Sequence, residues 1–413
     1  MADSGPTRGV TRAISLAVLV AALGYFVDIY DLILFSVVRV KSLKALGVPE
    51  PLLLDKGLLL LNMQMSGMLL GGILWGVLGD KRGRLSVLFG SILLYSVANI
   101  ANGLVTTVAA YAALRFLAGV GLAGELGAGI TLVSESMSKE HRGYGTMIVA
   151  TIGILGAVVA VFVGETFNWR VAYFVGGGLG LGLLVLRVGV IESGMFQHLK
   201  SKAQHVERGN FFKLFVPLAR ARRYVAVILI GVPIWFVVGI LVTLSKEFGE
   251  AMHMTVVPTP ARAVLFSYVG LAIGDFGSGW LSQRFRSRRR IVGAFLVLTA
   301  LFVAAYFVVG ARSLGVFYAV CLALGVSTGY WAVFVTIASE QFGTNLRATA
   351  TTTAPNFVRG AVVLLTSAFQ LAKAPLGVVG SGIAVGAVTL LVAFVALAGL
   401  EETYGKDLDF LEP

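Results

Sequence analysis

The two halves of this chain repeat each other at a nearly constant offset. Three glycines of the first half recur 203 residues later in the second: Gly67, Gly71 and Gly76 correspond to Gly270, Gly274 and Gly279. A Ser-Glu pair with a following arginine recurs 205 residues later: Ser134, Glu135 and Arg142 correspond to Ser339, Glu340 and Arg347. A shared offset in a chain of 413 residues predicts one helical bundle that occurs twice, with a pseudo-twofold axis between the copies.

Apolar runs of membrane-spanning length make up most of the chain. Hydrophobic residues account for 57% of the sequence and charged residues for only 13%, which is typical of polytopic membrane proteins. Runs of about 20 apolar residues, the length that crosses the hydrocarbon, begin near Ala13, Gly57, Leu85, Val108, Gly143, Val171, Tyr224, Arg262, Ile291, Leu314, Ala348 and Leu376. We therefore expect an all-α membrane protein of twelve transmembrane helices, six in each half.

The longest connection between apolar runs separates the halves. We expect a first six-helix bundle over residues 1–195, a linker over 196–223, a second bundle over 224–400 and an acidic tail over 401–413. The linker mixes Lys and Arg with Phe211, Phe212, Leu214 and Phe215, a pattern typical of an interfacial amphipathic helix. A solvated linker with one membrane-facing turn explains this pattern, and a regulatory role is the alternative.

Lysine and arginine residues gather on one side of the expected bilayer. That side carries Arg8, Arg12, Lys81, Arg82, Arg84, Lys139, Arg142, the cluster from Lys200 to Arg223 and the run from Arg284 to Arg290. By the positive-inside rule this side is cytoplasmic, and an even number of spans places both termini there. The first loop on the opposite side is an exception, with Arg39, Lys41, Lys44 and Lys56. We expect a multi-pass protein of the plasma membrane, which in bacteria is the inner membrane.

The net charge of +12 needs no nucleic acid to explain it. Most of this charge sets the topology and faces anionic lipid. The four histidines lie in loops without the spacing of metal ligands, and no nucleophile is paired with a base. We therefore expect no metal, no cofactor and no enzymatic activity. The expected partners are the bilayer, a small-molecule substrate and a proton, and the expected state is a monomer.

Six ionisable residues lie within the expected helices, where each costs about 3 kcal/mol or more at the bilayer centre. They are Asp28, Asp31, Arg115, Glu125, Asp275 and Arg359. Asp31 and Arg115 lie at equal depth, which predicts that they pair. Asp28 lies one turn deeper than Asp31, and two neighbouring carboxylates with one cation do not ionise together easily. We assign Asp28, Asp31, Arg115 and Glu125 to proton coupling, with purely structural pairing as the alternative.

Arg359 lies about twelve residues into the eleventh helix, close to the midplane. A permanently charged guanidinium at that depth needs an acidic partner or an anionic ligand. Two roles stay open: a cation for substrate, or one half of a structural clamp with Asp275. The aromatic and polar side chains that we expect at the substrate site with Arg359 are Tyr330, Trp331, Trp235, Asn356, Tyr30 and Gln64.

The loop after the second apolar run reads GVLGDKRGRLSVL, in which Gly76, Asp80, Gly83 and Arg84 have the spacing G-x-x-x-D-x-x-G-R. This loop resembles the signature loop of the major facilitator superfamily. A degenerate copy from Gly279 to Arg290, the run RFLAGVG and the two Glu-x6-Arg loops extend the resemblance over the whole chain. In that copy Gln283 replaces the acid and Ser287 replaces the arginine, so Arg284 and Arg288 are expected to take over.

The resemblance implies charge networks at the cytoplasmic helix ends that stabilise one conformation. One network would contain Asp80, Arg84, Glu135 and Arg142, and the other Arg284, Glu340 and Arg347. Helix capping and control of topology are the alternative role for these charges.

The first helix, GYFVDIYDLILF, has the spacing D-x-x-D-L and resembles the phosphate/proton and metabolite/proton symporter branches. Glu125 stands where the phosphate branch carries an acid after paired glycines, but Ala123 and Leu126 depart from that pattern, which counts against inorganic phosphate. Arg359 resembles the helix 11 arginine of organic-anion carriers. The resemblance implies a twelve-helix fold, alternating access, and proton-coupled symport of a small organic anion such as a carboxylate.

Several other functions remain open from the sequence. They are a proton-driven exporter of cationic or amphiphilic compounds, a phosphate carrier, a sugar carrier that would use Gln64, Asn62 and Asn356, and a membrane sensor without transport. The acids of the first half have no counterparts in the second, where Pro233, Phe236 and Tyr330 stand at the corresponding positions of Asp28, Asp31 and Glu125. We therefore expect the first half to handle protons and the second to contact much of the substrate.

Overall fold

The computed structural model describes residues 6–82, 84–125, 142–192, 211–406, 410 and 412. Every regular element in these ranges is helical. The first half contains α1 (Pro6–Ala45), α2 (Leu53–Arg82), α3 (Arg84–Asn102), α4 (Val108–Leu122), α6 (Arg142–Ile154), α7 (Gly156–Thr166) and α8 (Trp169–Glu192). The second half contains η2 (Phe211–Phe215), α10 (Leu218–Phe236), η3 (Val237–Val242), α11 (Ser245–Ala251), α12 (Pro260–Arg284), α13 (Arg288–Val308), α14 (Leu314–Thr328), α15 (Trp331–Glu340) and α16 (Thr344–Ala398).

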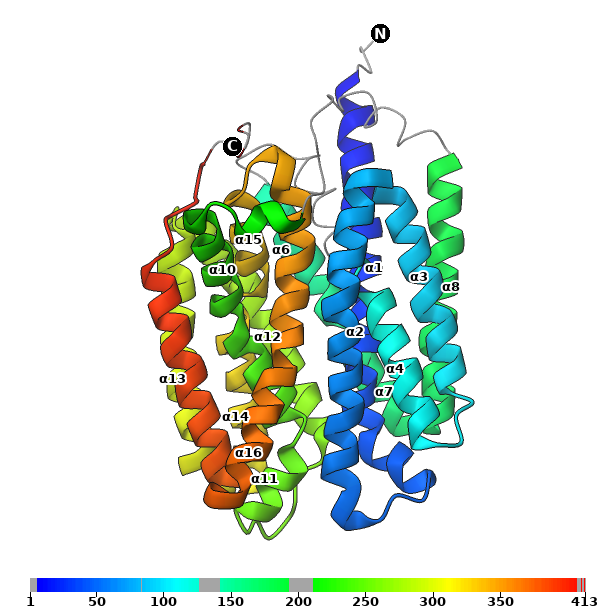
Figure 1. Ribbon diagram of the computed structural model, residues 1–413, viewed down its shortest axis with the longest axis vertical. Helices are drawn as coiled ribbons and strands as arrows, with labels where there is room; N and C mark the ends of the chain where they lie inside the picture. Colours follow the sequence, from blue (N-terminus) through cyan, green and yellow to red (C-terminus); the bar gives the residue numbers. More distant parts are fainter. Residues whose placement is uncertain are drawn as a thin grey trace.

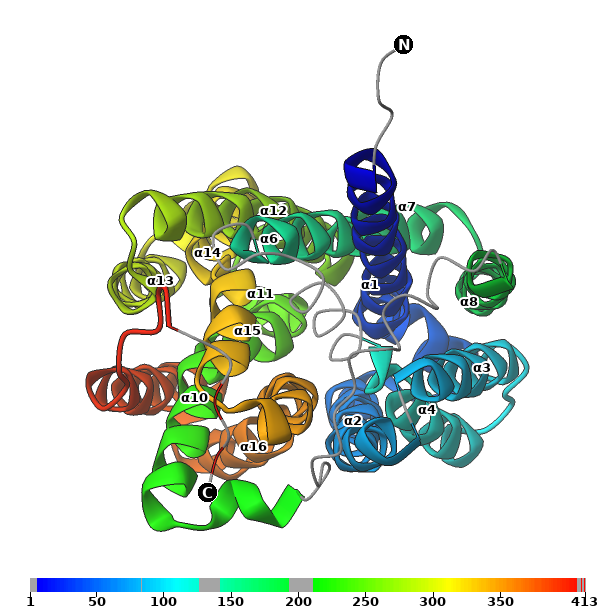
Figure 2. The ribbon, with the colours of Figure 1, turned by 90° about the horizontal axis from the view of Figure 1, so that it is seen from above.

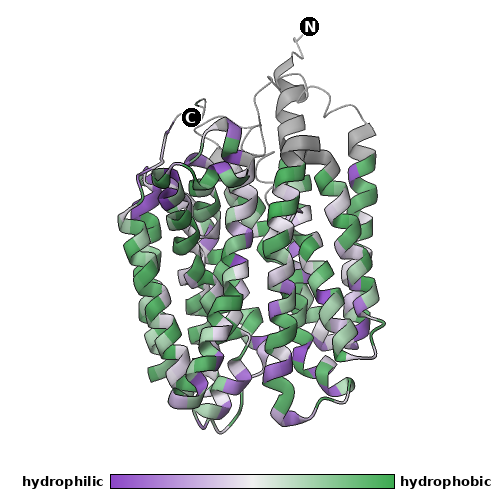
Figure 3. Cartoon of the chain, viewed as in Figure 1, coloured by the Kyte–Doolittle hydropathy of each residue, from purple (hydrophilic) through white to green (hydrophobic). Residues whose placement is uncertain are grey.

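The helices account for the twelve expected spans. Within the described ranges, nine helical stretches are long and apolar enough to cross a membrane, and α3 and α4 are shorter apolar helices. The longest stretch, α16, contains two spans, because Gly377 leaves helical geometry at φ 66°. Hydrophobic residues cover the helices along their length, and hydrophilic residues gather toward the ends (Figure 3). The expected helix starts agree with the observed ones to within seven residues, and the largest differences are at α1 and α10.

Figures 1 and 2 show two groups of helices, with α2, α3, α4 and α8 on one side and α10, α13, α14 and α16 on the other. The groups meet along a seam in which α2 packs against α16, and α6 packs against α12. α1 begins at the end of the molecule where the C-terminal residues also lie (Figure 1). We call this the basic end, because the run Arg284–Arg290 lies there, and the other the far end.

The repeated glycines make equivalent packing contacts in both halves. Gly67 lies against the backbone of α4 and Gly270 against that of α14, so a side chain at either position would collide with a main-chain carbonyl. Gly76 and Gly279 face across the seam instead, toward Thr353 of α16 and Met147 of α6. The offset in the sequence therefore marks equivalent packing contacts in a pseudo-symmetric pair of bundles.

At the far end, α1 joins the second half through buried polar contacts. Arg39 Nη2 lies 2.7 and 2.9 Å from the two carboxylate oxygens of Glu247, and Ser36 Oγ lies 3.1 Å from Thr243 Oγ1. The sequence placed Arg39 in the first loop, which is wrong, because α1 continues to Ala45 and Arg39 is completely buried. The far end of the seam is thus closed by an ion pair between the halves.

At the basic end, the C-terminal segment folds against the second half. Glu402 accepts hydrogen bonds from the hydroxyl of Ser287 and from the backbone N–H of Arg288 at 2.8 Å, at the first turn of α13. Glu412 is buried between Arg220 and Arg223. The sequence predicted only a short acidic tail here, whereas its carboxylates cap and pair with groups of the bundle.

The described part of the linker is short. Residues 193–210 lie outside the described ranges, and the remainder forms the 3-10 helix η2 before α10 begins at Leu218. Phe212, Phe215 and Val216 are exposed there. Exposed aromatic and aliphatic side chains at the end of a membrane bundle are typical of a segment that lies at the lipid interface.

Candidate functional site

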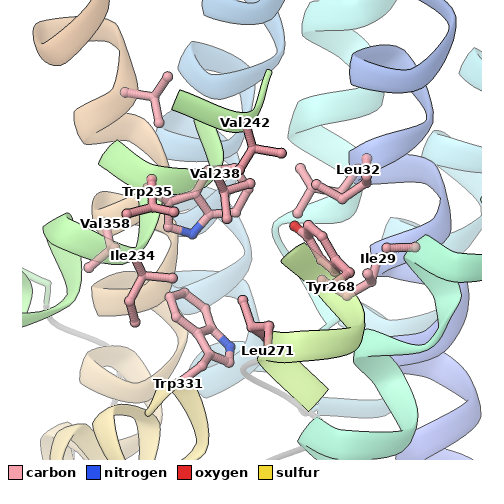
Figure 4. Close-up of a cluster of buried hydrophobic side chains, with 14 of the residues drawn as sticks. Ile29, Leu32, Ile234, Trp235, Val238, Val242, Tyr268, Leu271, Trp331 and Val358 are labelled. Atoms are coloured by element: carbon pink, nitrogen blue, oxygen red, sulfur yellow. The ribbon is translucent and has the colours of Figure 1, made fainter. Parts of the chain in front are cut away.

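A small cavity lies between the two halves near the middle of the bundle. The first half contributes Tyr25 and Ile29 of α1 and Ile154 of α6, and the second half contributes Ile234, Trp235, Val238, Tyr268, Leu271, Trp331 and Arg359. In Figure 4 the rings of Trp235 and Trp331 lie on one side of this space, and Ile29 lies on the other. Among the described residues of this lining, Arg359 is the only charged one, and the others are aromatic or aliphatic.

Arg359 pairs with Asp28 across the seam. Its Nη2 lies 3.3 Å from Oδ2 of Asp28, and both side chains are buried. The guanidinium also lies over the ring of Trp331, with 5.6 Å between its central carbon and the ring centroid. Nε and Nη1 of Arg359 and Nε1 of Trp331 make no hydrogen bond of ordinary geometry in the described part of the chain, although the Tyr25 hydroxyl lies near enough to interact with the guanidinium. The cavity therefore contains several donors that an anionic ligand could use.

Asp275 does not form the clamp with Arg359 that was one of the two roles left open by the sequence. Its Oδ1 accepts a hydrogen bond of 2.9 Å from the backbone N–H of Ala332, in the first turn of α15. A carboxylate at the N-terminus of a helix binds the free N–H groups there and is stabilised by the helix dipole. The depth of a residue in the bilayer does not fix the direction in which its helix turns the side chain.

Asp31 and Arg115 do not form the predicted ion pair. Arg115 instead donates to Oε1 of Gln64 and to the Tyr173 hydroxyl at 3.4 Å, and its guanidinium lies 4.5 Å from the centroid of the Phe35 ring. Neither oxygen of Asp31 accepts a hydrogen bond of ordinary geometry from the described residues, although Arg115 and Asn99 are near enough to interact with its charge. Both residues lie inside the first half, away from the cavity.

Glu125 forms a buried ion pair that the sequence did not predict. Arg187 of α8 donates to both of its oxygens, with 3.0 Å between Nη1 and Oε2. A side chain at Gly24 of α1 would collide with this pair. Arg187 lies five residues before the end of α8 and is absent from the membrane charges that the sequence singled out. The signal that identifies it is the apolar run Leu183 to Leu186 before it and Val188 after it.

Several predicted substrate residues lie elsewhere. The Tyr330 hydroxyl donates to the carbonyl of Ile230 at 2.8 Å, and the Tyr30 hydroxyl donates to the carbonyl of Ala172 at 2.9 Å, so both tyrosines pack within single halves. Gln64 accepts from Arg115, and Asn356 donates to the Ala123 carbonyl across the seam at 2.8 Å. None of these four belongs to the cavity lining, whereas Trp235, Trp331 and Arg359 do.

Tyr25 and Tyr268 line the cavity but were missed. Tyr25 lies one turn before Asp28 on the same face of α1, as the i, i+3 spacing requires. An aromatic residue one turn from a membrane-buried acid was therefore the available signal for Tyr25. Tyr268 lies two turns before Asp275 in α12, and no comparable signal separates it from other packed aromatics.

The expected charge networks are described only in the second half. Glu135 and the side chains of Asp80, Arg84 and Arg142 lie outside the described residues. Glu340 is buried and pairs with Arg288, with 3.4 Å between Oε2 and Nε, while the Thr403 hydroxyl donates to it at 2.8 Å. Arg347 is buried at the same end. Arg284 is exposed as the last residue of α12, so Arg288 takes the place that the sequence gave to both arginines.

Comparison with known proteins connects this geometry to a family. The niacin transporter NiaP of Acinetobacter baylyi is 27% identical over 314 residues, which cover 68% of this chain and 70% of that protein. The gentisate transporter of Corynebacterium glutamicum is 25% identical over 418 residues, which cover 96% and 90% of the two chains. The similarity to each of these proteins thus spans both halves of the molecule.

The fold is also that of a solved transporter. The structure of the proton:xylose symporter XylE bound to 6-bromo-6-deoxy-D-glucose matches with a TM-score of 0.70 and 16% identity over 97% of this chain and 98% of that one. This match confirms the predicted twelve-helix architecture. The family model of the major facilitator superfamily matches residues 14–367. The chain therefore belongs to the major facilitator superfamily, as a multi-pass membrane transporter and not an enzyme.

Proposed function

We propose that this protein transports a small aromatic monocarboxylate together with a proton. The observation that carries the proposal is the cavity, in which one arginine with free donors lies among the rings of Tyr25, Trp235, Tyr268 and Trp331. A planar guanidinium binds a carboxylate through two parallel hydrogen bonds, and aromatic walls stack on a flat ring. A ligand with one carboxylate and one aromatic ring uses both features.

The polarity of the cavity supports this substrate class. Phosphate and sugars need several polar partners, and the lining offers mainly Ile29, Ile154, Ile234 and Leu271 besides the aromatics. Two relatives are named for niacin and gentisate, each of which has one carboxylate on one six-membered aromatic ring. A cationic substrate would be repelled by Arg359.

The pair of Asp28 with Arg359 supports proton coupling. While Asp28 is ionised, it neutralises the guanidinium and competes with an incoming carboxylate for it. Protonation of Asp28 removes that competitor and leaves Arg359 with a full positive charge in a medium of low dielectric constant. Proton and anion therefore favour each other's binding at one arginine, and reciprocal coupling follows by linkage. Transfer of one proton with one monovalent anion is electrically neutral.

The seam provides the route for alternating access. Arg39, Glu247, Ser36 and Thr243 close the far end in this conformation. We place the basic end in the cytoplasm by the positive-inside rule, and the protein as a monomer in the bacterial inner membrane. Rocking of the halves would break the far-end contacts and expose the cavity to the opposite side.

Uptake into proteoliposomes tests the proposal. An inward-directed proton gradient, with a lower pH outside the liposomes than inside, should drive accumulation of radiolabelled nicotinate or gentisate by the wild type. Lactate, phosphate and xylose should compete poorly for this uptake. Asp28→Asn should abolish accumulation driven by the pH gradient, yet spare exchange of internal for external substrate. Asp55→Asn, the same chemical change at an exposed position in the first turn of α2, should leave both activities intact. Retention of pH-driven accumulation by Asp28→Asn would refute this coupling mechanism.

A further inference from the structure

One face of α3 carries polar side chains through the interior of the first half. Tyr95, Asn99 and Asn102 follow one another at spacings of four and three residues, which places them on one helix face, and Ser96 lies beside them. All four are at most 1% exposed. None of them lines the substrate cavity, so the cavity does not explain why a membrane helix buries these groups.

These polar groups make no hydrogen bond of ordinary geometry to the described residues, although Asn99 lies near enough to Asp31 to interact with its carboxylate. They are the Tyr95 hydroxyl, the Ser96 hydroxyl, and the amide oxygen and nitrogen of both Asn99 and Asn102. Both carboxylate oxygens of Asp31 share this property. Buried polar groups in native proteins are almost always hydrogen-bonded, and where protein groups do not supply the partner, internal water does.

The groups follow one another from Asp31 to Glu125. Asn99 and Arg115 lie near Asp31, and the two acids Asp28 and Asp31 are one turn apart on α1. Tyr95 lies near enough to interact with Glu125 and Arg187 on one side and with Asp31 on the other. Tyr95 thus lies within interaction distance of both acidic sites of the first half.

Glycines of α8 leave room beside this row of groups. A side chain at Gly176 would collide with the carboxylate of Asp31, and one at Gly180 would collide with the Ser96 hydroxyl and come within 2.8 Å of the Tyr95 ring. The two glycines are four residues apart and so lie on one face of α8, opposite the polar face of α3. Because Gly176 and Gly180 have no side chains, the α8 backbone can lie directly against Asp31, Ser96 and Tyr95 without displacing them.

We propose that this row is a hydrated proton path inside the first half, which leads from Asp31 past Asn99, Ser96 and Tyr95 to Glu125. It rests on the proposed proton coupling. The proton on Asp28 passes to the carboxylate of Asp31 one turn away. Through water at Asn99 and the Tyr95 hydroxyl it reaches Glu125, which becomes a neutral acid and releases Arg187. Each transfer leaves the donor carboxyl ionised and the acceptor protonated, so charge and atoms balance.

The charged and titratable groups around the path act on each end. Asp31 faces Asp28 and Tyr30 of α1, Tyr95 of α3, Arg115 of α4 and Tyr173 of α8. At the other end, Glu125 is paired with Arg187 and lies near enough to Asp28 to interact with its charge. A proton on this route need not cross the substrate cavity. Substrate at Arg359 and proton at Asp28 then leave the centre by separate routes.

Two substitutions test the path. Tyr95→Phe removes only the hydroxyl, and Asn99→Leu replaces an amide by an apolar group of similar size. Each should slow nicotinate accumulation driven by a pH gradient, and the accompanying proton flux into a pH dye, by about 10-fold or more, which corresponds to about 1.4 kcal/mol in a barrier. Exchange of labelled for unlabelled nicotinate should stay within about 2-fold of wild type, because Asp28, Arg359 and the cavity are unchanged.

Matched controls separate the path from general packing. Tyr306→Phe removes a hydroxyl that donates to the Leu241 carbonyl in the second half, and Ser91→Ala removes one that already donates to the Leu88 carbonyl on α3 itself. Both control variants should couple nicotinate accumulation to proton flux as the wild type does. Wild-type coupling by Tyr95→Phe and Asn99→Leu would overturn the path but leave proton symport standing. An equal loss of exchange and proton flux in both variants would also overturn it, in favour of a structural role. Absence of coupling in the wild type would refute the proposed function itself.

Hydration can be measured without transport. Radiolytic hydroxyl-radical labelling in detergent modifies buried side chains that contact internal water. Tyr95 should be labelled at least about 10-fold faster than the equally buried Tyr306. Equal, slow labelling of both tyrosines would contradict a hydrated path. This measurement uses the wild-type protein, so it also decides the question if Asn99→Leu fails to fold.

Discussion

Asp28 of α1 and Arg359 of α16 form a buried ion pair at the centre of the molecule, with 3.3 Å between Oδ2 and Nη2, although 331 residues separate them in the chain. The pair joins the half that contains most of the buried acids to the half that contains most of the cavity lining. A buried ion pair contributes little net stability, but removal of one partner leaves an uncompensated charge. The pair is therefore well suited to a switch that a proton or an anion opens.

The energetic dependence of the two residues can be measured by a double-mutant cycle. Arg359→Ala should lower the free energy of unfolding by about 3 kcal/mol, because it leaves Asp28 buried without a cation. Asp28→Asn in that background should recover much of the loss, because the asparagine carries no charge. Thermal unfolding of the four proteins in detergent at neutral pH measures the coupling. Additive effects of the two substitutions would show that the residues do not interact.

Arg359 should also control the affinity for carboxylates. Arg359→Lys keeps the charge but loses the planar fork, so nicotinate should bind about 10-fold more weakly, a loss of about 1.4 kcal/mol. Arg359→Ala should lose about 100-fold or more. Quenching of tryptophan fluorescence by nicotinate, read through Trp235 and Trp331, measures this binding without transport. If Arg359→Ala keeps wild-type affinity, the anion binds elsewhere.

The aromatic side chains of the cavity should favour carboxylates with an aromatic ring over aliphatic carboxylates. Trp331→Leu should weaken nicotinate binding about 2- to 10-fold, because stacked aromatic pairs contribute about 0.5–1.5 kcal/mol beyond burial. Trp331→Phe should retain most of the affinity. Trp280→Leu is the matched control, because that side chain is 50% exposed on the outside of α12 and touches no cavity. Competition by an aliphatic carboxylate should be unaffected by Trp331→Leu, and an equal loss for both ligands would contradict stacking.

A covalent link across the far-end contacts should block transport reversibly. Ser36 Oγ and Thr243 Oγ1 are 3.1 Å apart, so cysteines at both positions should form a disulfide across the seam. Oxidation of Ser36→Cys/Thr243→Cys should stop nicotinate exchange, and dithiothreitol should restore it. Each single cysteine variant serves as the control, since Cys321, the chain's one natural cysteine, is buried. Exchange that persists in the oxidised double variant would show that the far end need not open.

Glu402 should give the basic end a pH-dependent stability. Partial burial raises the pKa of this carboxyl, but hydrogen bonds from Ser287 and from the backbone at Arg288, Arg289 and Tyr404 outweigh burial, so the net pKa lies below its usual value. A lowered pKa in the folded state stabilises the fold above the ordinary glutamate pKa of about 4.3, and this contribution disappears as pH falls through the folded-state pKa.

Glu402→Gln should therefore lower the melting temperature at pH 7 and narrow the difference from the wild type as pH approaches about 3. The effect should be no more than about 1 kcal/mol, because the side chain is partly in solvent. Scanning calorimetry of both proteins across this range measures it. Glu401→Gln, the same change at the exposed neighbouring residue, should shift the melting temperature little at any pH. A constant difference between wild type and Glu402→Gln at all pH values would contradict the capping role.

The sequence by itself determined the architecture and identified the ionisable residues whose burial in the membrane is unfavourable in free energy. Apolar runs define twelve spans because hydrocarbon excludes polar segments, and the offset of 203 residues marks Gly67 and Gly270 because only glycine lets two backbones touch. Asp28, Asp31, Glu125 and Arg359 stand out in the sequence because an ionised group inside a membrane must have a function or a partner.

Only the tertiary structure decided the partners. Depth along a helix follows from counting residues, but the direction of a side chain depends on how each helix is rotated against its neighbours, and packing across the seam sets that rotation. Arg359 therefore pairs with Asp28 and not with Asp275, and Arg39 pairs with Glu247, 208 residues away. The rotation of each helix also decides which side chains reach the cavity. Tyr25 lines the cavity, whereas the Tyr330 hydroxyl donates to the carbonyl of Ile230 within the second half.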